Sequence, residues 1–149
     1  MSEPATVHGS AALVGERGVL IRGASGTGKS SLLLALLATD PVSTWLIADD
    51  RVILTAANGR LIAAAAPALA GLMEIRGRGI VRRLFVSPAC LDLVVDLMPP
   101  ASCERMPSIG GGSGALYGVQ LPHLRLPIGA ADGPARVRAA LARESATKL

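Results

Sequence analysis

"GVLIRGASGTGKS", from Gly18 to Ser30, joins a short apolar run to a glycine-rich loop. The loop matches the Walker A pattern Gly-x-x-x-x-Gly-Lys-Ser in full. Its glycines allow the backbone to curl so that successive N–H groups face a phosphate, and the N-terminus of a following helix adds positive potential. A strand is predicted over 19–22, and a helix over 29–38 that Asp40-Pro41 ends. The residues predicted to bind the phosphates of a nucleotide are Gly23, Ala24, Ser25, Gly26, Thr27, Gly28, Lys29 and Ser30.

Two residues of this loop are expected to do more than present backbone groups. Lys29 is expected to contact the β- and γ-phosphates, and the hydroxyl of Ser30 is expected to bind Mg²⁺. The alternative is a chance loop of glycine and serine, which the strand before it and the helix after it disfavour. The motif indicates phosphate binding, but it does not identify the group that receives a phosphoryl group.

The composition limits the fold. Half of the 149 residues are hydrophobic, yet the chain has only one Trp, one Tyr and one Phe. The core must therefore consist of Ala, Val, Leu and Ile, which suits a buried sheet covered by small helices. The length suits a single domain over 1–149, with disorder expected only at its ends. The pattern predicts a mixed α/β fold with more strand than helix and without the strand–helix alternation of a Rossmann fold.

Charge and cysteine usage narrow the functional class. The net charge is +4, mainly from arginines, but no aromatic residues alternate with them as in nucleic-acid-binding proteins. An anionic ligand beside ordinary solvated surface is therefore favoured over nucleic acid. Cys90 and Cys103 have no cysteine or histidine cluster around them and indicate cytosolic thiols. The N-terminus does not resemble a signal peptide, and the apolar stretch 61–73 contains Pro67 and is too short to span a bilayer. A soluble cytoplasmic protein is expected.

Other elements are predicted from apolar runs and turn residues. Asn58-Gly59 accepts the positive φ angles of a tight turn and predicts a hairpin between 52–54 and 61–64. Asp92 and Asp96 are interpreted as the solvent-facing side of a strand. Further expected elements are strands over 7–14, 45–48, 91–98, 116–121 and 124–127, a loop or short helix over 65–73, a turn over 74–79, and a helix from Gly133 to Glu144.

Paired carboxylates follow the apolar strand over 45–48, at Asp49 and Asp50. A Walker B strand ends in such a carboxylate, which holds the metal directly or through water. Two in succession allow one to serve the metal and the other to accept a proton from an attacking hydroxyl. A surface turn with a helix cap or a salt bridge is the alternative, and the complete Walker A motif favours the functional interpretation.

Several motifs together resemble one family, the C-terminal catalytic domain of bacterial HPr kinase/phosphorylase. The similarity extends over roughly 8–140 and is closest to the short, single-domain versions of proteobacteria. "EIRGRGI" is the family's own signature and is more specific than Walker A. The matching stretches, in order, are "HGSAALV" (8–14), "GVLIRGASGTGKS" (18–30), "LIADD" (46–50), "EIRGRGI" (74–80) and "ERMP" (104–107).

The resemblance implies a P-loop core of the HPr kinase and phosphoenolpyruvate carboxykinase type, in which helices flank a mixed sheet. It implies an ATP-dependent protein-serine kinase that uses Mg²⁺ and acts on HPr, the phosphocarrier of the sugar phosphotransferase system. Members of the family also remove the phosphate by phosphorolysis, use pyrophosphate as a donor, and form hexamers. These properties are expectations for this chain.

The resemblance also assigns residues that handle phosphate and metal. Lys29 matches the phosphate-loop lysine, and Ser30 and Glu74 match Mg²⁺ ligands. Asp49 is expected to assist the metal or its orientation. From the residues alone, Glu74 could instead form a structural salt bridge with Arg76.

Three residues match catalytic positions of the family. Asp50 matches the group that accepts the proton in the kinase direction and returns it in the reverse. His8 matches an active-site histidine and Arg105 an active-site arginine. Without the family, His8 is better interpreted as an ordinary core or surface histidine, and Arg105 as half of an exposed ion pair with Glu104. Three further arginines fit either a docking face for an acidic partner or solvated surface: Arg78, Arg82 and Arg83.

The chain departs from the family at three points. Ser31 stands where an acidic residue is common, and 126–133 has no counterpart of a Pro-Gly-Arg loop that is associated with the phosphorylase direction. No N-terminal regulatory domain is expected. Two other functions stay open, namely a kinase for another protein or a small molecule and a non-catalytic ATP-binding regulator. The complete set of Lys29, Ser30, Asp50 and Glu74 disfavours the regulator.

Overall fold

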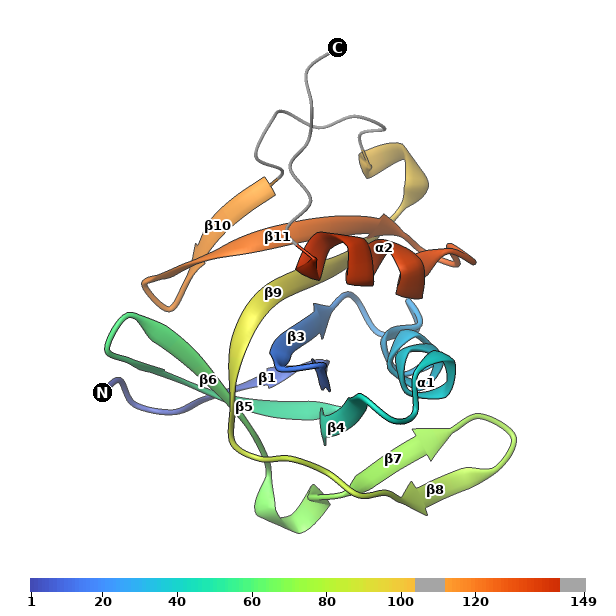
Figure 1. Ribbon diagram of the computed structural model, residues 1–149, viewed down its shortest axis with the longest axis horizontal. Helices are drawn as coiled ribbons and strands as arrows, with labels where there is room; N and C mark the ends of the chain where they lie inside the picture. Colours follow the sequence, from blue (N-terminus) through green and yellow to red (C-terminus); the bar gives the residue numbers. More distant parts are fainter. Residues whose placement is uncertain (104–111, 143–149) are drawn as a thin grey trace.

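The computed structural model describes residues 1–103 and 112–142, and it contains a large mixed sheet with two α-helices on one side (Figure 1). The helices are α1 (Lys29–Thr39) and α2 (Gly133–Leu141), with short 3₁₀ turns at Pro67–Leu69 and Pro100–Ser102. The strands are β1 (Ala5–His8), β2 (Ser10–Val14), β3 (Arg17–Arg22), β4 (Thr44–Ala48), β5 (Arg51–Ala57), β6 (Arg60–Ala65), β7 (Leu72–Ile75), β8 (Gly79–Arg82), β9 (Ala89–Met98), β10 (Gly112–Leu116) and β11 (Val119–Pro127). The mixed α/β fold expected from the sequence is thus observed.

Strand β9 is the branch point of the sheet. The main order is β1-β5-β6-β9-β3-β2-β4, and β11 also pairs with β9 and carries β10 at its outer edge. The start of β9 pairs with β6, and 94–98 pairs with β11, so the strand changes partners along its length. Figure 1 shows β9 as the long curved strand between these two groups. β7 and β8 form a separate hairpin.

Four strands end at the same edge of the sheet. β3 and β11 both pair with β9 in parallel. β4 and β3 are both antiparallel to β2, so β4 points the same way as β3. Ligands of open α/β sheets bind beyond the carboxyl ends of such strands. The topology therefore places the glycine-rich loop after β3 and the aspartates after β4 at one edge.

Apolar side chains form a core on each face of the sheet. On the helix side, Leu33 and Leu36 of α1 pack with Ile21, Val95 and other buried residues of the strands. A second cluster on the opposite face contains the intervening residues of the same strands, such as Leu20 and Val94. Because both faces are covered, the middle parts of the two central strands, 19–21 of β3 and 93–95 of β9, are apolar, as the composition suggested.

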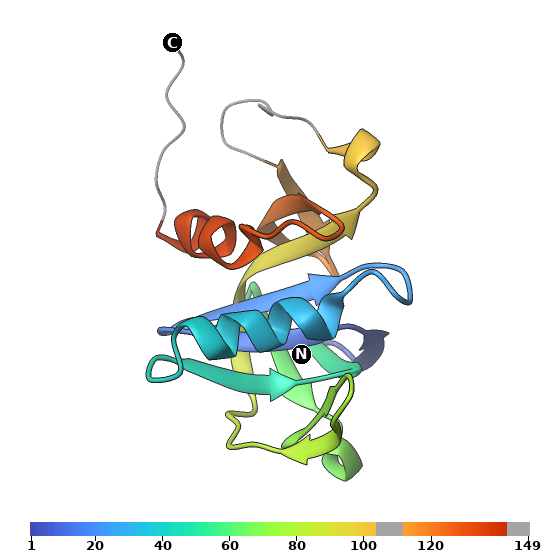
Figure 2. The same cartoon turned by 90° about the vertical axis from the view of Figure 1, so that its right-hand side faces the viewer.

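Helix α2 is fixed to the end of α1 by one arginine. Arg138 of α2 donates hydrogen bonds to the hydroxyl of Thr39 at 2.7 Å and to the carbonyl oxygen of Leu36 at 2.8 Å. These contacts satisfy groups at the C-terminus of α1, where a positive charge is favourable. Figure 2 shows the two helices side by side on this face of the sheet. Neither helix of the described residues has the length and hydrophobicity that crossing a bilayer requires.

The predictions for local elements were confirmed around the loop, for the strand over 45–48 and for the hairpin at Asn58-Gly59, and three others differ from the structure. The predicted strand over 7–14 is two strands separated at Gly9, because β1 pairs with β5 whereas β2 pairs with β3 and β4. The predicted turn over 74–79 is shorter in the structure and covers 76–78. Glu74 and Ile75 belong to β7, and Gly79 begins β8. A hairpin turn at Tyr117-Gly118 divides the predicted strand over 116–121. The predicted end of the last helix at Glu144 lies outside the described residues.

The interpretation of Asp92 and Asp96 as a solvent-facing pair was wrong. Asp92 lies at an irregularity in the β3–β9 ladder, and its carboxylate accepts a hydrogen bond from the backbone N–H of Gly18 at 3.0 Å. Asp96 accepts hydrogen bonds from Arg22 Nε at 2.9 Å and Nη2 at 3.2 Å, and it lies 3.3 Å from Nδ1 of His123. Both aspartates are half-buried and join β9 to its neighbours.

Gly18 gives a test of this packing. A Cβ atom at this position would collide with the carbonyl oxygen of Cys90, which is backbone and cannot rotate away. We expect Gly18→Ala to lower the free energy of unfolding by about 1–3 kcal/mol, as overpacking does. Urea denaturation of this variant and of Glu16→Ala, an exposed position in the preceding turn, measures the effect. Equal stability of the two variants would contradict the close approach of β3 and β9.

Candidate functional site

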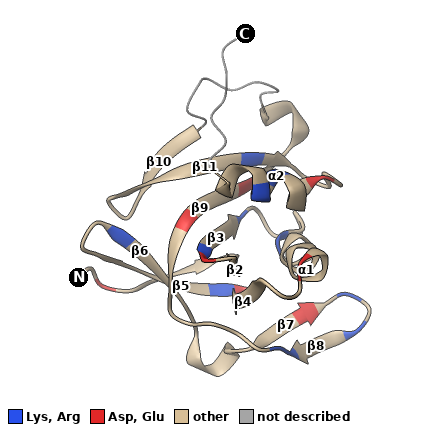
Figure 3. Ribbon diagram, viewed as in Figure 1, with Lys and Arg blue, Asp and Glu red and all other residues tan. Residues whose placement is uncertain are grey.

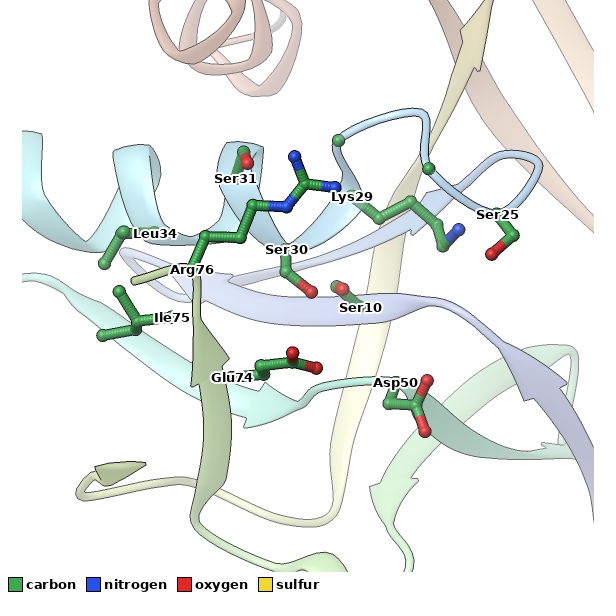
Figure 4. Close-up of a pocket in the computed structure, with 12 residues that line it drawn as sticks. Ser10, Ser25, Lys29, Ser30, Ser31, Leu34, Asp50, Glu74, Ile75 and Arg76 are labelled. Carbon is green, nitrogen blue, oxygen red and sulfur yellow. The ribbon is translucent and has the colours of Figure 1, made fainter. Parts of the chain in front are cut away.

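A cavity of about 360 Å³ opens at the shared strand edge between the glycine-rich loop, α1, the end of β4 and β7. The side chains of Lys29 and Ser30 reach it from the loop and from α1, and those of Asp50 and Glu74 reach it from the strands (Figure 4). Arg76 extends along the same opening from the end of β7. Segments far apart in sequence thus bring two cationic and two anionic side chains to one cavity.

The glycine-rich loop has the curled backbone that its sequence predicts. Gly26 and Gly28 have positive φ angles of 82° and 96°, and Gly28 is the N-cap of α1. Most residues with a Cβ atom are strained at such angles, so glycine is required there. Thr27 closes the loop by donating from its hydroxyl to the carbonyl oxygen of Ala24 at 2.7 Å. Lys29 Nζ donates to the carbonyl oxygens of Gly23 at 2.9 Å and Ala24 at 3.1 Å, which holds the cation over the loop.

Asp49 is the buried centre behind this cavity. The residue is 5% exposed, and Oδ1 accepts hydrogen bonds from the hydroxyls of Ser10 and Ser30, each at 2.8 Å. Oδ2 accepts a hydrogen bond from the backbone N–H of Glu74 at 3.3 Å. A buried carboxylate is tolerated when donors surround it, and these three donors belong to β2, α1 and β7. Asp49 therefore fixes the position of Ser30 relative to Glu74.

Asp50 differs from its neighbour in both exposure and backbone. It is exposed, lines the cavity, and has a φ angle of 68°, in the left-handed region that aspartate tolerates better than most residues. Its carbonyl oxygen accepts a hydrogen bond from the N–H of Gly9 at 3.1 Å, which fixes the turn between β4 and β5. Strained backbone of this kind gathers at functional sites, where it aims a side chain. Here the turn places two successive carboxylates in different surroundings: that of Asp49 is buried, and that of Asp50 is exposed in the cavity.

The β7–β8 hairpin brings the family-signature stretch to the cavity. Along β7, Met73 is buried and Glu74 is exposed, so alternation points the carboxylate toward the opening. Glu74 and Arg76 both line the cavity and form no ion pair with each other within the described part of the chain. Figure 3 shows that the basic residues of this hairpin lie at its tip and along β8, beside the acidic residue of β7.

Oxygen donors at the site suit a magnesium ion. Within 1–103 and 112–142, no group of three or more His, Cys, Asp or Glu side chains forms a metal cluster. Mg²⁺ in phosphoryl-transfer sites needs fewer protein ligands, since phosphate oxygens and water complete its shell. Ser30 and Glu74 line the cavity with a hydroxyl and a carboxylate, and the buried carboxylate of Asp49 lies directly behind them, so the residues present fit Mg²⁺.

Of the two remaining predicted residues, the structure describes only His8, which lies apart from this group. His8 is exposed at the end of β1, opposite Arg51 in the β1–β5 ladder, and is not part of the cavity wall. Arg105 lies outside the described residues. Sequence reasoning missed Ser10, which is 1% exposed and donates to Asp49. The only signal for Ser10 was that it is the one polar residue in β2, whose other residues are all apolar.

Comparisons with known proteins point to one family. The model of the HPr Serine kinase C-terminal domain matches residues 1–149. The chain is 32% identical over 124 residues to the HPr kinase/phosphorylase of Mycoplasma mycoides, covering 76% of this chain and 39% of that protein. It is 33% identical over 138 residues to the HPr kinase/phosphorylase of Lactiplantibacillus plantarum, covering 86% of this chain and 43% of that protein. The chain thus spans about two fifths of the length of these curated relatives.

A solved structure has the same fold. The Hpr(Ser) kinase/phosphatase from Coxiella burnetii matches with a TM-score of 0.79 at 24% identity, covering 93% of this chain and 94% of that one. The predicted fold class is therefore confirmed.

The two adjacent aspartates provide a matched test of the site. Asp49→Asn replaces one acceptor oxygen by an NH2 group, which cannot accept a hydrogen bond and faces a donor instead, so we expect the free energy of unfolding to fall by about 1–3 kcal/mol. Asp50→Asn keeps a residue suited to a left-handed backbone at an exposed position, and we expect a change below about 0.5 kcal/mol. Thermal and urea unfolding of both variants measures the difference. Equal losses would mean that the hydrogen bonds to Asp49 do not stabilise the fold.

Proposed function

The chain belongs to the family of the HPr serine kinase C-terminal domain, and from this we propose that it transfers the terminal phosphoryl group of ATP to a serine of HPr. The observation that carries the proposal is the single cavity that Lys29, Ser30, Asp50 and Glu74 line together. A phosphate-binding loop, oxygen ligands for a metal and an open carboxylate are the parts that phosphoryl transfer to a hydroxyl requires.

The glycine-rich loop and Lys29 bind the phosphates in this proposal. The backbone N–H groups between Gly23 and Ser30 face the phosphate oxygens, and Lys29 exchanges its two carbonyl partners for the β- and γ-phosphates. Ser30, Asp49 and Glu74 would hold Mg²⁺, which neutralises charge on the transferring group. The hydrogen bonds to Asp49 preset the positions of the ligand groups before the nucleotide binds.

Asp50 is the proposed catalytic base. A serine hydroxyl is a weak nucleophile, and it must lose its proton as the new O–P bond forms and the bond to the β-phosphate oxygen breaks. Asp50 accepts that proton, ADP departs, and phosphoserine remains. In the reverse reaction an oxygen of phosphate attacks the phosphorus of phosphoserine, the serine O–P bond breaks, and the phosphoryl group leaves as pyrophosphate while the protonated Asp50 returns the proton to the serine oxygen. Its exposure supports this role, because a protein substrate must reach it.

Three further parts of the proposal rest on the family resemblance. His8 and Arg105 are proposed active-site residues, and His8 lies directly before Gly9, whose N–H binds the backbone of Asp50. The chain is proposed to act in the cytoplasm as a homo-hexamer. The basic β7–β8 hairpin beside the cavity supports docking of an acidic protein surface there.

Asp50→Asn tests the base. The variant should retain Mg-ATP binding, because Asp50 is not a phosphate ligand in the proposal, and it should lose transfer by at least about a hundredfold. The assay mixes the protein with Mg²⁺, γ-labelled ATP and purified HPr and measures acid-stable label on HPr, while calorimetry measures ATP binding. A native transfer rate in Asp50→Asn would overturn the assignment of the base.

Controls distinguish the identity of the acceptor protein from the ability of the chain to transfer a phosphoryl group. Lys29→Ala should lose the label together with ATP affinity, since it removes a phosphate ligand. Phosphate added to labelled HPr tests the reverse reaction, for which this chain lacks the family's Pro-Gly-Arg loop. ATP binding without any label on HPr would contradict HPr as the acceptor and favour another acceptor or a regulatory binder.

A further inference from the structure

A second cavity, of about 470 Å³, lies against a different face of α1 from the charged one. Leu32 and Ala35 of α1 line it, and across from them stand Leu97 at the end of β9 and the loop 127–131 after β11. Along a helix, residues 32, 35 and 39 share one face, whereas residues 30 and 34, which line the charged cavity, share another. The two cavities therefore flank the beginning of α1.

The two cavities meet at the phosphate loop. Gly26, Gly28 and Ser31 contribute to both of them. A ligand whose phosphates occupy the loop can therefore extend into the second cavity without leaving the protein surface. Both cavities also lie at the carboxyl ends of parallel strands, the first beyond β3 and β4 and the second beyond β9 and β11.

The chemical character of the two cavities is opposite. Lys29, Asp50, Glu74 and Arg76 line the first, whereas no charged side chain of the described residues lines the second. The second is lined mainly by Leu, Pro, Ile, Ala and Gly, with hydroxyls only from Thr27, Ser31 and Thr39. A nucleoside triphosphate has a similar division, with a highly charged chain at one end and at the other an uncharged, flat aromatic base whose faces are apolar and whose edge forms hydrogen bonds.

We propose that this second cavity binds the nucleobase of the nucleotide whose phosphates the glycine-rich loop holds. This inference rests on the proposed function. The proposed function supplies the nucleotide, and the inference adds the place where its base lies. A cavity of this size and apolar lining, with a few polar groups at its edge, is typical of sites for small organic ligands. The charged cavity is then left to the γ-phosphate, the metal and the acceptor serine.

The loop after β11 is held in place as a cavity wall. The N–H of Ile128 donates to the carbonyl oxygen of Met98 at 2.9 Å, which ties the loop to the end of β9. Ala130 and Gly133 close two further turns, each through a 3.2 Å hydrogen bond to a residue three positions earlier. Because these bonds fix the loop, little conformational entropy is lost when a base enters, and the small side chains of 129–131 leave room for it.

Filling the cavity tests the proposal. Ala35→Phe places a ring where the base would lie, and we expect its Kd for ATP to rise at least about tenfold, while its Kd for inorganic tripolyphosphate changes less than about twofold. Ala38→Phe is the matched control, since Ala38 is exposed on the same helix and lines neither cavity. Ala131→Phe is a second variant at an exposed loop position, so it keeps the test valid if Ala35→Phe does not fold.

The outcomes separate this inference from the proposed function. Native ATP affinity in both cavity variants overturns the inference and leaves the proposed kinase intact. A native chain that binds neither ATP nor tripolyphosphate overturns the proposed function, and the inference with it.

Photolabelling provides a direct readout. 8-Azido-ATP bound to the native chain should attach to the tryptic peptide Leu126–Arg136, which carries the loop wall of the second cavity. Excess ATP should remove this label, whereas label absent from that peptide and present on Leu61–Arg76, which carries the charged wall, would overturn the proposal.

Discussion

The carboxylate of Asp49 is the contact on which the rest of the site depends. It is almost fully buried, and a buried charge is tolerated only with donors around it. Those donors come from β2, from the first turn of α1 and from β7, three segments that no sheet ladder joins to one another at that point. Because the Asp49 carboxylate accepts hydrogen bonds from all three segments, it sets the separation between the phosphate loop and the β7–β8 hairpin. The cavity between them follows from that separation.

The branching of β9 has a similar effect on a larger scale. This strand pairs first with β6 and later with β11. It therefore has two parallel neighbours, β11 and β3, and the glycine-rich loop follows β3. The sheet edge is thereby widened on one side of α1 by β11 and its loop, and on the other by β4 with its aspartates. Helix α1 begins in the middle of this edge, and Gly28 and Ser31 at its N-terminus line the cavities on both sides.

The sequence predicted the parts of the structure that local chemistry determines. The Walker A loop with its strand and helix, and the hairpin at Asn58-Gly59, were confirmed because glycine, turn residues and apolar runs act within a few residues. The division at Gly9 depends on which strands pair with β1 and β2, and the pairing of Asp96 with Arg22 depends on the register of β3 and β9. Such long-range choices leave no local pattern. The motifs did identify residues that share the charged cavity, but Ser10 was missed because one serine in an apolar strand carries no functional signal.

The backbone at Asp50 limits which residues evolution can place there. A left-handed φ angle favours glycine, asparagine and aspartate, and for other residues it costs on the order of 1 kcal/mol. Glycine and asparagine lack a carboxylate, so aspartate alone satisfies both the turn and an acidic group at this point. Glutamate, the usual conservative exchange, fits the charge but not the turn. The geometry of the main chain thus accounts for the identity of a side chain that chemistry alone would leave open to two amino acids.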